Sequence, residues 1–194
     1  LQESYEGLEQ KVAARTGELA RLVENLRALS QSSQALSATL ELRTVLDAIV
    51  ARATDLSGAH GGAIYEYDEA SQEFHVSATH RMAPEHFEAV RAAPIRLGEG
   101  AVGLAGARRI PVQVSDILDP QEPVAPHIRP ILSRLGQRSS LALPLLREQR
   151  LLGCLVVWRR ETGSFAAEVV DTLQTFAAQS ALAIQNARLF QEIQ

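Results

Sequence analysis

The closing stretch, residues 165–194, contains no Gly or Pro and constrains the fold more than any other part of the chain. Apolar residues recur in it at steps of three and four, which predicts a long helix. One stripe holds Val169, Leu173, Phe176, Ser180 and Ile184, and a second holds Leu182, Leu189 and Ile193. One stripe suffices to cover a sheet. The second therefore predicts contact with another helix, the alternative being a terminal helix packed only on its own domain.

The opening segment, residues 1–36, carries a heptad pattern with two Gly and no Pro. Ten of the twelve core positions from Leu1 to Leu40 are apolar, the exceptions being Arg15 and Ser33, which is typical of a coiled coil. A lone amphipathic helix is the alternative, but such a helix is marginal in water, so pairing with a second copy is favoured. The predicted dimer contacts are Leu8, Val12, Leu19, Leu22, Leu26, Leu29 and Leu36, together with Leu182, Leu189 and Ile193 of the closing helix.

Composition sets the class of protein. The length of 194 residues and a hydrophobic content of 46% fit one globular domain, residues 37–194, plus the helical appendage. A net charge of −4 argues against nucleic-acid binding, and the single cysteine, Cys154, excludes an internal disulfide or a cysteine-based zinc site. No apolar run approaches the length of a membrane span. We expect a cytoplasmic piece of a longer protein, whose remainder could hold an anchor in the inner membrane.

The middle of the chain alternates short strands and helices. Strands are expected at 63–67, 73–78, 110–114, 139–146 and 150–159, the last two forming a hairpin. Helices are expected at 42–56 and 82–91, with a short one after residue 97 and a helical or loop-like stretch at 124–135. This order predicts an α+β fold, an antiparallel sheet with helices on one face, rather than a parallel sheet.

Several of these stretches resemble a known family. The segments are Leu97-Gly98-Glu99-Gly100, Ser139-Ser140-Leu141-Ala142-Leu143-Pro144-Leu145, Leu152-Gly153-Cys154-Leu155-Val156-Val157 and residues 176–190. Residues 36–194 resemble a GAF domain, the small-molecule-sensing relative of the PAS fold. Residues 8–19 resemble the linker helix that follows HAMP domains in bacterial sensor histidine kinases. The resemblance implies a six-stranded antiparallel sheet with a ligand pocket on one face and the terminal helices on the other. It also implies a parallel homodimer and a downstream kinase domain.

Two motifs bear on cofactors. Residues 98–103 satisfy G-x-G-x-x-G, but no buried strand precedes them and the helix that follows is short, which argues against a dinucleotide site. GAF relatives that hold a bilin covalently use a Cys beside a His, whereas this chain reads Ala125-Pro126-His127-Ile128. Covalent bilin attachment is therefore not expected. Non-covalent haem or tetrapyrrole binding stays open, the cyclic-nucleotide signature is not evident, and the cofactor is unknown.

The candidate ligand-binding residues are polar side chains expected around an apolar pocket. They are Asp116, His127, Arg138, Ser139, Trp158 and His80. An ordinary cap, surface charge or sheet residue is the alternative for each. No histidine pair has metal-ligand spacing, and Ser139 and Ser140 lack a histidine partner, so neither a metal site nor a catalytic residue is predicted.

Together these patterns predict a sensory module of a bacterial signal-transduction protein, most simply a sensor histidine kinase that uses ATP in a phosphorelay. The segment itself is not expected to be an enzyme. Its partners would be a second copy, a small molecule and a kinase domain of the same parent, with no nucleic acid and no membrane contact. The alternatives are a ligand-free dimerisation spacer, or a small enzyme such as the GAF-type methionine sulfoxide reductases, whose chemistry needs reactive cysteines.

Overall fold

The computed structural model describes residues 15–17, 21, 23–24 and 41–192, and the side chains up to residue 189. Residues 15–17, 21, 23 and 24 are helical. Most of the predicted dimer contacts, Leu8, Val12, Leu19, Leu22, Leu26, Leu29, Leu36 and Ile193, lie outside the described residues. The coiled coil therefore stays a prediction.

A six-stranded antiparallel sheet forms the centre of the fold, in the order β3-β2-β1-β6-β5-β4. The strands are β1 (Gly61–Asp68), β2 (Glu73–His80), β3 (Ile95–Arg96), β4 (Val112–Val114), β5 (Ser139–Arg147) and β6 (Arg150–Arg159). The predicted hairpin is β5–β6, and its two turn residues, Glu148 and Gln149, both have positive φ (48° and 70°), as a two-residue hairpin turn requires. The two-residue strand β3 was not predicted, because it is too short to show an alternating pattern.

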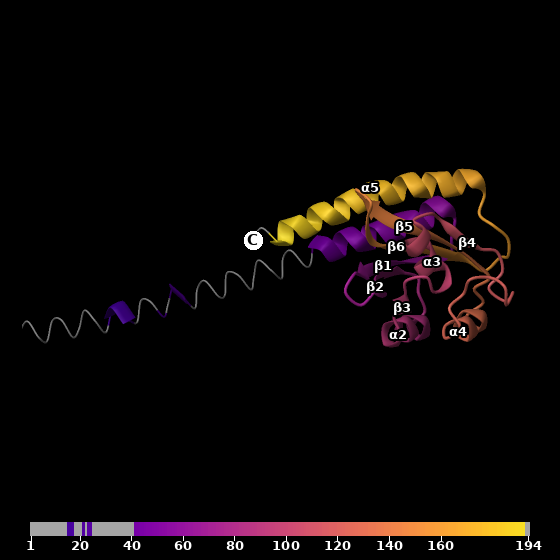
Figure 1. Cartoon of the computed structure of the whole chain (residues 1–194), viewed down its shortest axis with the longest axis horizontal. Helices are drawn as coiled ribbons and strands as arrows, with labels where there is room; N and C mark the ends of the chain where they lie inside the picture. The colour runs from indigo at the N-terminus through magenta and orange to yellow at the C-terminus, as the bar shows by residue number, and fades with distance from the viewer. Residues whose placement is uncertain (1–14, 18–20, 22, 25–40, 193–194) are drawn as a thin grey trace, which may run out of the picture.

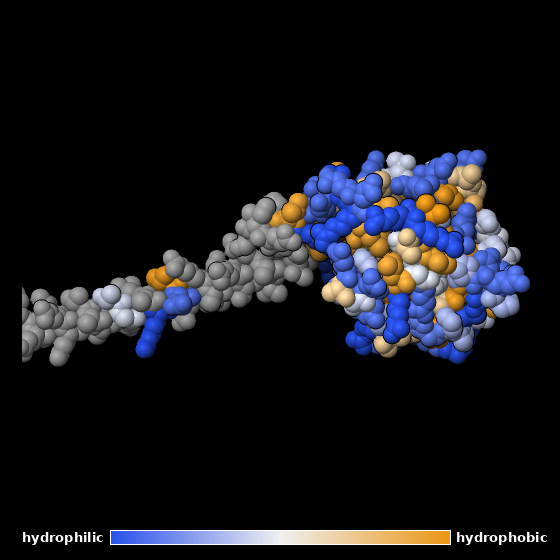
Figure 2. Space-filling view, viewed as in Figure 1, coloured by the Kyte–Doolittle hydropathy of each residue, from blue (hydrophilic) through white to orange (hydrophobic). Residues whose placement is uncertain are grey.

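Two long helices cover one face of the sheet. The helix over residues 41–57 and α5 (Ala167–Glu192) lie side by side there (Figure 1). Their apolar stripes, including Val50 and Leu173, pack on Ile64, Leu143 and Leu155 of the central strands. Hydrophilic side chains cover much of the visible surface of the domain, with hydrophobic ones in separate patches (Figure 2).

Three short helices cover the other face, which corrects the prediction of helices on one face only. They are α2 (Pro84–Ala92), α3 (Gly100–Arg108) and α4 (Arg129–Arg134). The physical reason is that the central strands carry apolar side chains on both faces. Tyr65 and Val156 point away from α5 and belong to a second apolar core, so that face of the sheet must also be shielded from water. Each covering helix has at most nine residues, too few for a clear helical period.

Candidate functional site

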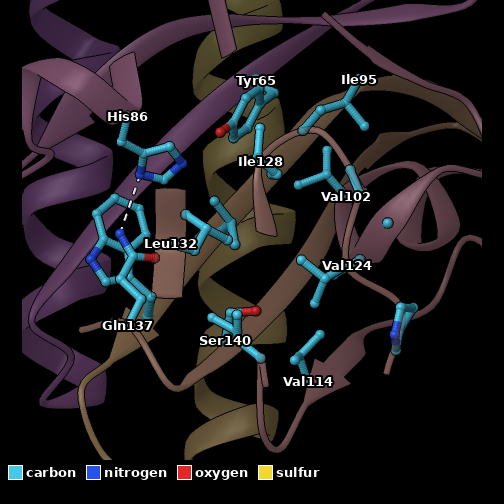
Figure 3. Close-up of a pocket in the computed structure, with 17 residues that line it drawn as sticks. Tyr65, His86, Ile95, Val102, Val114, Val124, Ile128, Leu132, Gln137 and Ser140 are labelled. Atoms are coloured by element: carbon cyan, nitrogen blue, oxygen red, sulfur yellow. Dashed lines mark hydrogen bonds between the residues drawn. The ribbon is translucent and has the colours of Figure 1, made fainter. Parts of the chain in front are cut away.

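A cavity of about 50 Å³ lies on the face of the sheet covered by α2, α3 and α4. Its floor comes from β1, β5 and β6, and its sides come from the three helices and from residues 115–128, which connect β4 to α4. Figure 3 shows branched aliphatic side chains, among them Val114, Val124 and Ile128, around this space. The lining consists of Tyr65, His86, Ile95, Gly100, Ala101, Val102, Val114, Ile117, Pro123, Val124, Ala125, Ile128, Leu132, Gln137, Ser140, Val156 and Trp158.

Polar groups gather at one end of this cavity. The Nε2 amide of Gln137 donates to Nδ1 of His86 at 3.2 Å, and the His86 and Trp158 rings lie 5.5 Å apart. An amide nitrogen can only donate, so Nδ1 of the neutral ring accepts and Nε2 carries the proton. Figure 3 shows Nε2 of His86 and the Tyr65 hydroxyl directed toward the same part of the cavity.

The Tyr65 hydroxyl and Nε2 of His86 make no hydrogen bond to any described residue. Their side chains are nevertheless buried, with exposed fractions of 2% and 4%. Within the described part of the chain no fully enclosed polar side-chain atom lacks a partner, so these two atoms are open to the cavity rather than sealed in apolar packing. They are the groups that a bound molecule would meet.

The cavity is uncharged near neutral pH. Burial lowers the pKa of His86 to about 4 and raises that of the Tyr65 hydroxyl. Burial likewise raises the pKa of the Cys154 thiol, on the same face of the sheet, so this cysteine is not an activated nucleophile. None of these groups is prepared for acid–base or nucleophilic catalysis, and no cluster of metal-ligating side chains occurs among the described residues.

The connection over residues 115–128 forms one wall of the cavity and is organised by a single side chain. The Arg129 guanidinium donates to the carbonyl oxygens of Ile117 (2.6 Å), Asp119 (2.5 Å) and Glu122 (2.7 Å). Glu122 in turn accepts a hydrogen bond from the amide of Ser115 at 2.9 Å. These bonds lie within the connection and its neighbour Arg129, so they hold it together as a unit.

Of the six predicted ligand-binding residues, only Trp158 lines the cavity. Asp116 and Arg138 form an ion pair at 2.9 Å outside it, and the Arg138 hydrogen bond lowers the pKa of the Asp116 carboxyl. Ser139 donates to the carbonyl of Glu161 at 2.7 Å, whereas its neighbour Ser140, on the other face of the strand, lines the cavity.

The two predicted histidines also lie elsewhere. His127 contacts the Ala93 carbonyl at 3.2 Å and Glu99 at 3.3 Å, beside a solvent-open hollow. His80 pairs across the strands with Gly62, and a Cβ atom at Gly62 would point toward Val50. Because cross-strand partners project to the same face, His80 belongs to the face that α5 covers. Sequence reasoning missed Tyr65, His86 and Gln137. For Tyr65 the alternation of β1 was an available signal, but nothing local distinguished the other two.

The glycines of the G-x-G-x-x-G stretch have a packing role. A side chain at Gly103 would meet the Arg96 carbonyl, and one at Gly100 would approach the Ala125 nitrogen to 2.9 Å. These close approaches explain why residues without a side chain stand at positions 100 and 103.

A second set of polar contacts joins the sheet to α5. Arg188 of α5 binds Glu66 of β1, which also accepts a hydrogen bond from Ser77 of β2 at 2.7 Å. Arg147 of β5 donates to Gln185 of α5 at 2.8 Å. Of the described helices, none is long and apolar enough to cross a membrane.

An antiparallel sheet with a cavity on one face and long terminal helices on the other defines a class of small α+β regulatory domains. The family model for the GAF domain matches residues 39–185, so the chain belongs to the GAF domain family. This confirms the family resemblance of the sequence. No curated protein matches the chain.

Solved structures place the same domain in different proteins. The GAF domain of a phosphoenolpyruvate-protein phosphotransferase from Coxiella burnetii is 26% identical (TM-score 0.65, covering 83% of this chain and 94% of that chain). A domain of a putative two-component sensor histidine kinase from Sinorhizobium meliloti is 19% identical (TM-score 0.61; 75% and 91%). A free methionine-R-sulfoxide reductase from Thermoplasma acidophilum is 15% identical (TM-score 0.61; 77% and 96%). At these last two identities the likeness shows the fold alone.

Proposed function

We propose that this GAF domain is the sensory module of a bacterial signal-transduction protein, a sensor histidine kinase being the parent that fits best. A small molecule in the cavity would favour one arrangement of the sheet and of α5. Through α5 that arrangement would reach a kinase domain in the same parent chain. Support comes from the family, from a structural neighbour described as a sensor histidine kinase domain, and from one contact described next.

The observation that carries this proposal is that β1 contacts both the cavity and α5. Tyr65 faces the cavity, and the next residue, Glu66, binds Arg188 of α5 on the opposite face. Successive residues of a strand point to opposite faces, so a shift of Tyr65 on ligand binding would displace Glu66 as well. The β1–β2 pairing has a register shift between Ile64 and Tyr65, where β2 carries one extra residue, Ser77, whose hydroxyl donates to Glu66.

The far end of α5 is suited to respond. Ile184 is its last buried side chain among those described, and beyond it the helix is held to the sheet by the Gln185 and Arg188 contacts. A half-exposed ion pair contributes about 1 kcal/mol or less, so the pair guides the helix rather than driving it. Switching from mostly one state to mostly the other needs about 5 kcal/mol, which the ligand's differential affinity would have to supply.

The dimer is part of the proposal. Leu182 and Leu189 are large apolar side chains with exposed fractions of 41% and 44%, and they stand one heptad apart on α5. That spacing continues the heptad pattern of the opening segment, so a second copy of this chain is the occupant we propose for this stripe. A parallel arrangement would carry α5 of both copies toward the output domain.

A ligand-free spacer is the second candidate, and the size of the cavity favours it. About 50 Å³ is far below the roughly 300–1,000 Å³ of ligand pockets, so in this conformation the protein's own side chains nearly fill the space. A spacer needs only the dimer and the rigidity of the domain. A sensor needs the cavity to open and α5 to respond.

Amide hydrogen exchange over residues 180–189 distinguishes the two candidates. Leu132→Ala enlarges the cavity from α4, across the sheet from α5, and Val90→Ala is the matched control in the same core away from the cavity lining. For a sensor, Leu132→Ala changes exchange at this end of α5 several-fold while Val90→Ala does not, and Glu66→Gln abolishes the difference. Equal effects of the two alanine variants would favour the spacer.

A further inference from the structure

The chemistry of the cavity restricts what it can hold. Its lining includes no Asp, Glu, Lys or Arg, and its two titratable groups, His86 and Tyr65, are neutral near neutral pH. An ion placed there without a partner would pay a large desolvation penalty. The lining therefore selects against both anions and cations.

The cationic side chains beside the cavity are already engaged. Arg129 donates to three carbonyl groups of the wall, and Arg138 is paired with Asp116 through two hydrogen bonds of 2.9 and 3.2 Å. Turning either guanidinium toward an anionic ligand would break the contacts that hold residues 115–128 together or to β5. Neither guanidinium group is therefore available to bind a phosphate or carboxylate in the cavity.

The polar end of the cavity offers donors. Nε2 of His86 carries a proton because Nδ1 accepts from Gln137, and the Tyr65 hydroxyl has its proton available. Both point into the same part of the space (Figure 3). Two convergent donors suit a single acceptor atom, such as a carbonyl oxygen or an unprotonated ring nitrogen.

Room for such a molecule requires outward movement of one wall. The present volume holds a few water molecules at most, at about 10–15 Å³ of such space each. The wall over residues 115–128 contains no helix or strand, and Arg129 ties its carbonyl groups together. Its outward movement would leave the strand pairing intact but would have to loosen its hydrogen bonds to Arg138 and Gly163.

We propose that the ligand of this cavity is a small uncharged molecule, mainly apolar and no larger than a ring with one substituent, whose hydrogen-bond acceptor is held by Tyr65 and His86. This inference rests on the proposed function, because it assumes that the cavity opens to a ligand. It assigns the chemical class and the two recognising side chains.

An isosteric series tests the class. Benzamide, benzoate and benzamidine share one shape and are respectively neutral, negative and positive. Trp158 is the only tryptophan of the chain and lines the cavity, so its fluorescence reports occupancy directly. We expect benzamide to give a saturable change in emission and the two charged compounds to bind at least about ten-fold more weakly, or about 1.4 kcal/mol.

Two conservative variants test the recognising group. Tyr65→Phe removes the cavity hydroxyl and should weaken benzamide binding about five- to ten-fold without lowering stability, because that hydroxyl has no partner in the described protein. Tyr67→Phe is the matched control, since Tyr67 is on the same strand and does not line this cavity. It should bind benzamide as the parent does.

Three results would overturn the inference. They are equal or tighter binding of either charged compound, no saturable response to benzamide, and equal affinities of the Tyr65→Phe and Tyr67→Phe variants. Each leaves the exchange experiment on α5 free to support a sensor with another ligand. If benzamide binds selectively but hydrogen exchange in α5 does not respond, the sensory function is refuted and the ligand class is retained.

Discussion

His86 should make the stability of this domain depend on pH in a defined window. The ring is buried, and its Nδ1 accepts a hydrogen bond from Gln137. Protonation would place a second N–H against that amide nitrogen and a charge in an apolar cavity. For these reasons the folded protein resists protonation at this position, and burial lowers the pKa of His86 to about 4.

The sign follows from comparing folded and unfolded chains. In the unfolded chain the pKa is 6.5, against about 4 in the folded protein, so between these values only the unfolded chain takes up the proton. Stability is therefore complete above pH 6.5 and falls as the pH drops through the window. A difference of about 2.5 units corresponds to roughly 3 kcal/mol at ~1.4 kcal/mol per unit, of which about 2 kcal/mol is lost between about pH 7 and about pH 5.

The assay compares the parent with His86→Phe in urea unfolding at about pH 7 and about pH 5, followed by Trp158 fluorescence. The variant loses the Gln137 hydrogen bond at both pH values, which shifts its free energy of unfolding by a constant. All other titrating groups are common to the two proteins. The parent should therefore lose about 2 kcal/mol more than the variant on acidification. Parallel losses would refute the assignment of a neutral, buried His86.

Three further predictions concern packing, surface charge and assembly. Gly153→Ala should lower the free energy of unfolding by about 3 kcal/mol or more in urea titrations, because the added methyl would meet the Tyr65 carbonyl of the paired strand. Asp116→Asn should flatten the acid limb of the stability profile, because Arg138 lowers the pKa of that carboxyl and its contribution, present above the ordinary pKa, is lost as pH falls. Leu182→Asp should shift sedimentation from dimer to monomer with the domain still folded, and a variant that remains dimeric would contradict the proposed α5 stripe.

The regular elements of the domain were largely predictable from local sequence pattern. The alternation in 139–146 and 150–159 corresponds to β5 and β6, and the run after residue 165 corresponds to α5. These elements are long enough to repeat their period several times. The strand β3 was not predicted, and neither was the placement of the short helices on the second face of the sheet. A strand of two residues or a helix of about two turns is too short to repeat its apolar period.

The candidate site was predictable only in part. Trp158 was expected and lines the cavity, but Asp116 and Arg138 satisfy each other outside it, and choosing Ser139 over Ser140 selected the wrong face of β5. A shift of one residue along a strand reverses the side-chain direction. Polarity alone therefore could not say which groups face the space.

The sequence by itself determined the longer strands and helices, the family and the apolar character of the central strands, because these depend on neighbours a few residues apart. Tertiary structure decided which polar groups meet. His86 and Gln137 are 51 positions apart, and Glu66 and Arg188 are 122 apart. Only the folded chain brings such pairs together, and only the packing of α2, α3, α4 and residues 115–128 against the sheet sets how much space is left in the cavity.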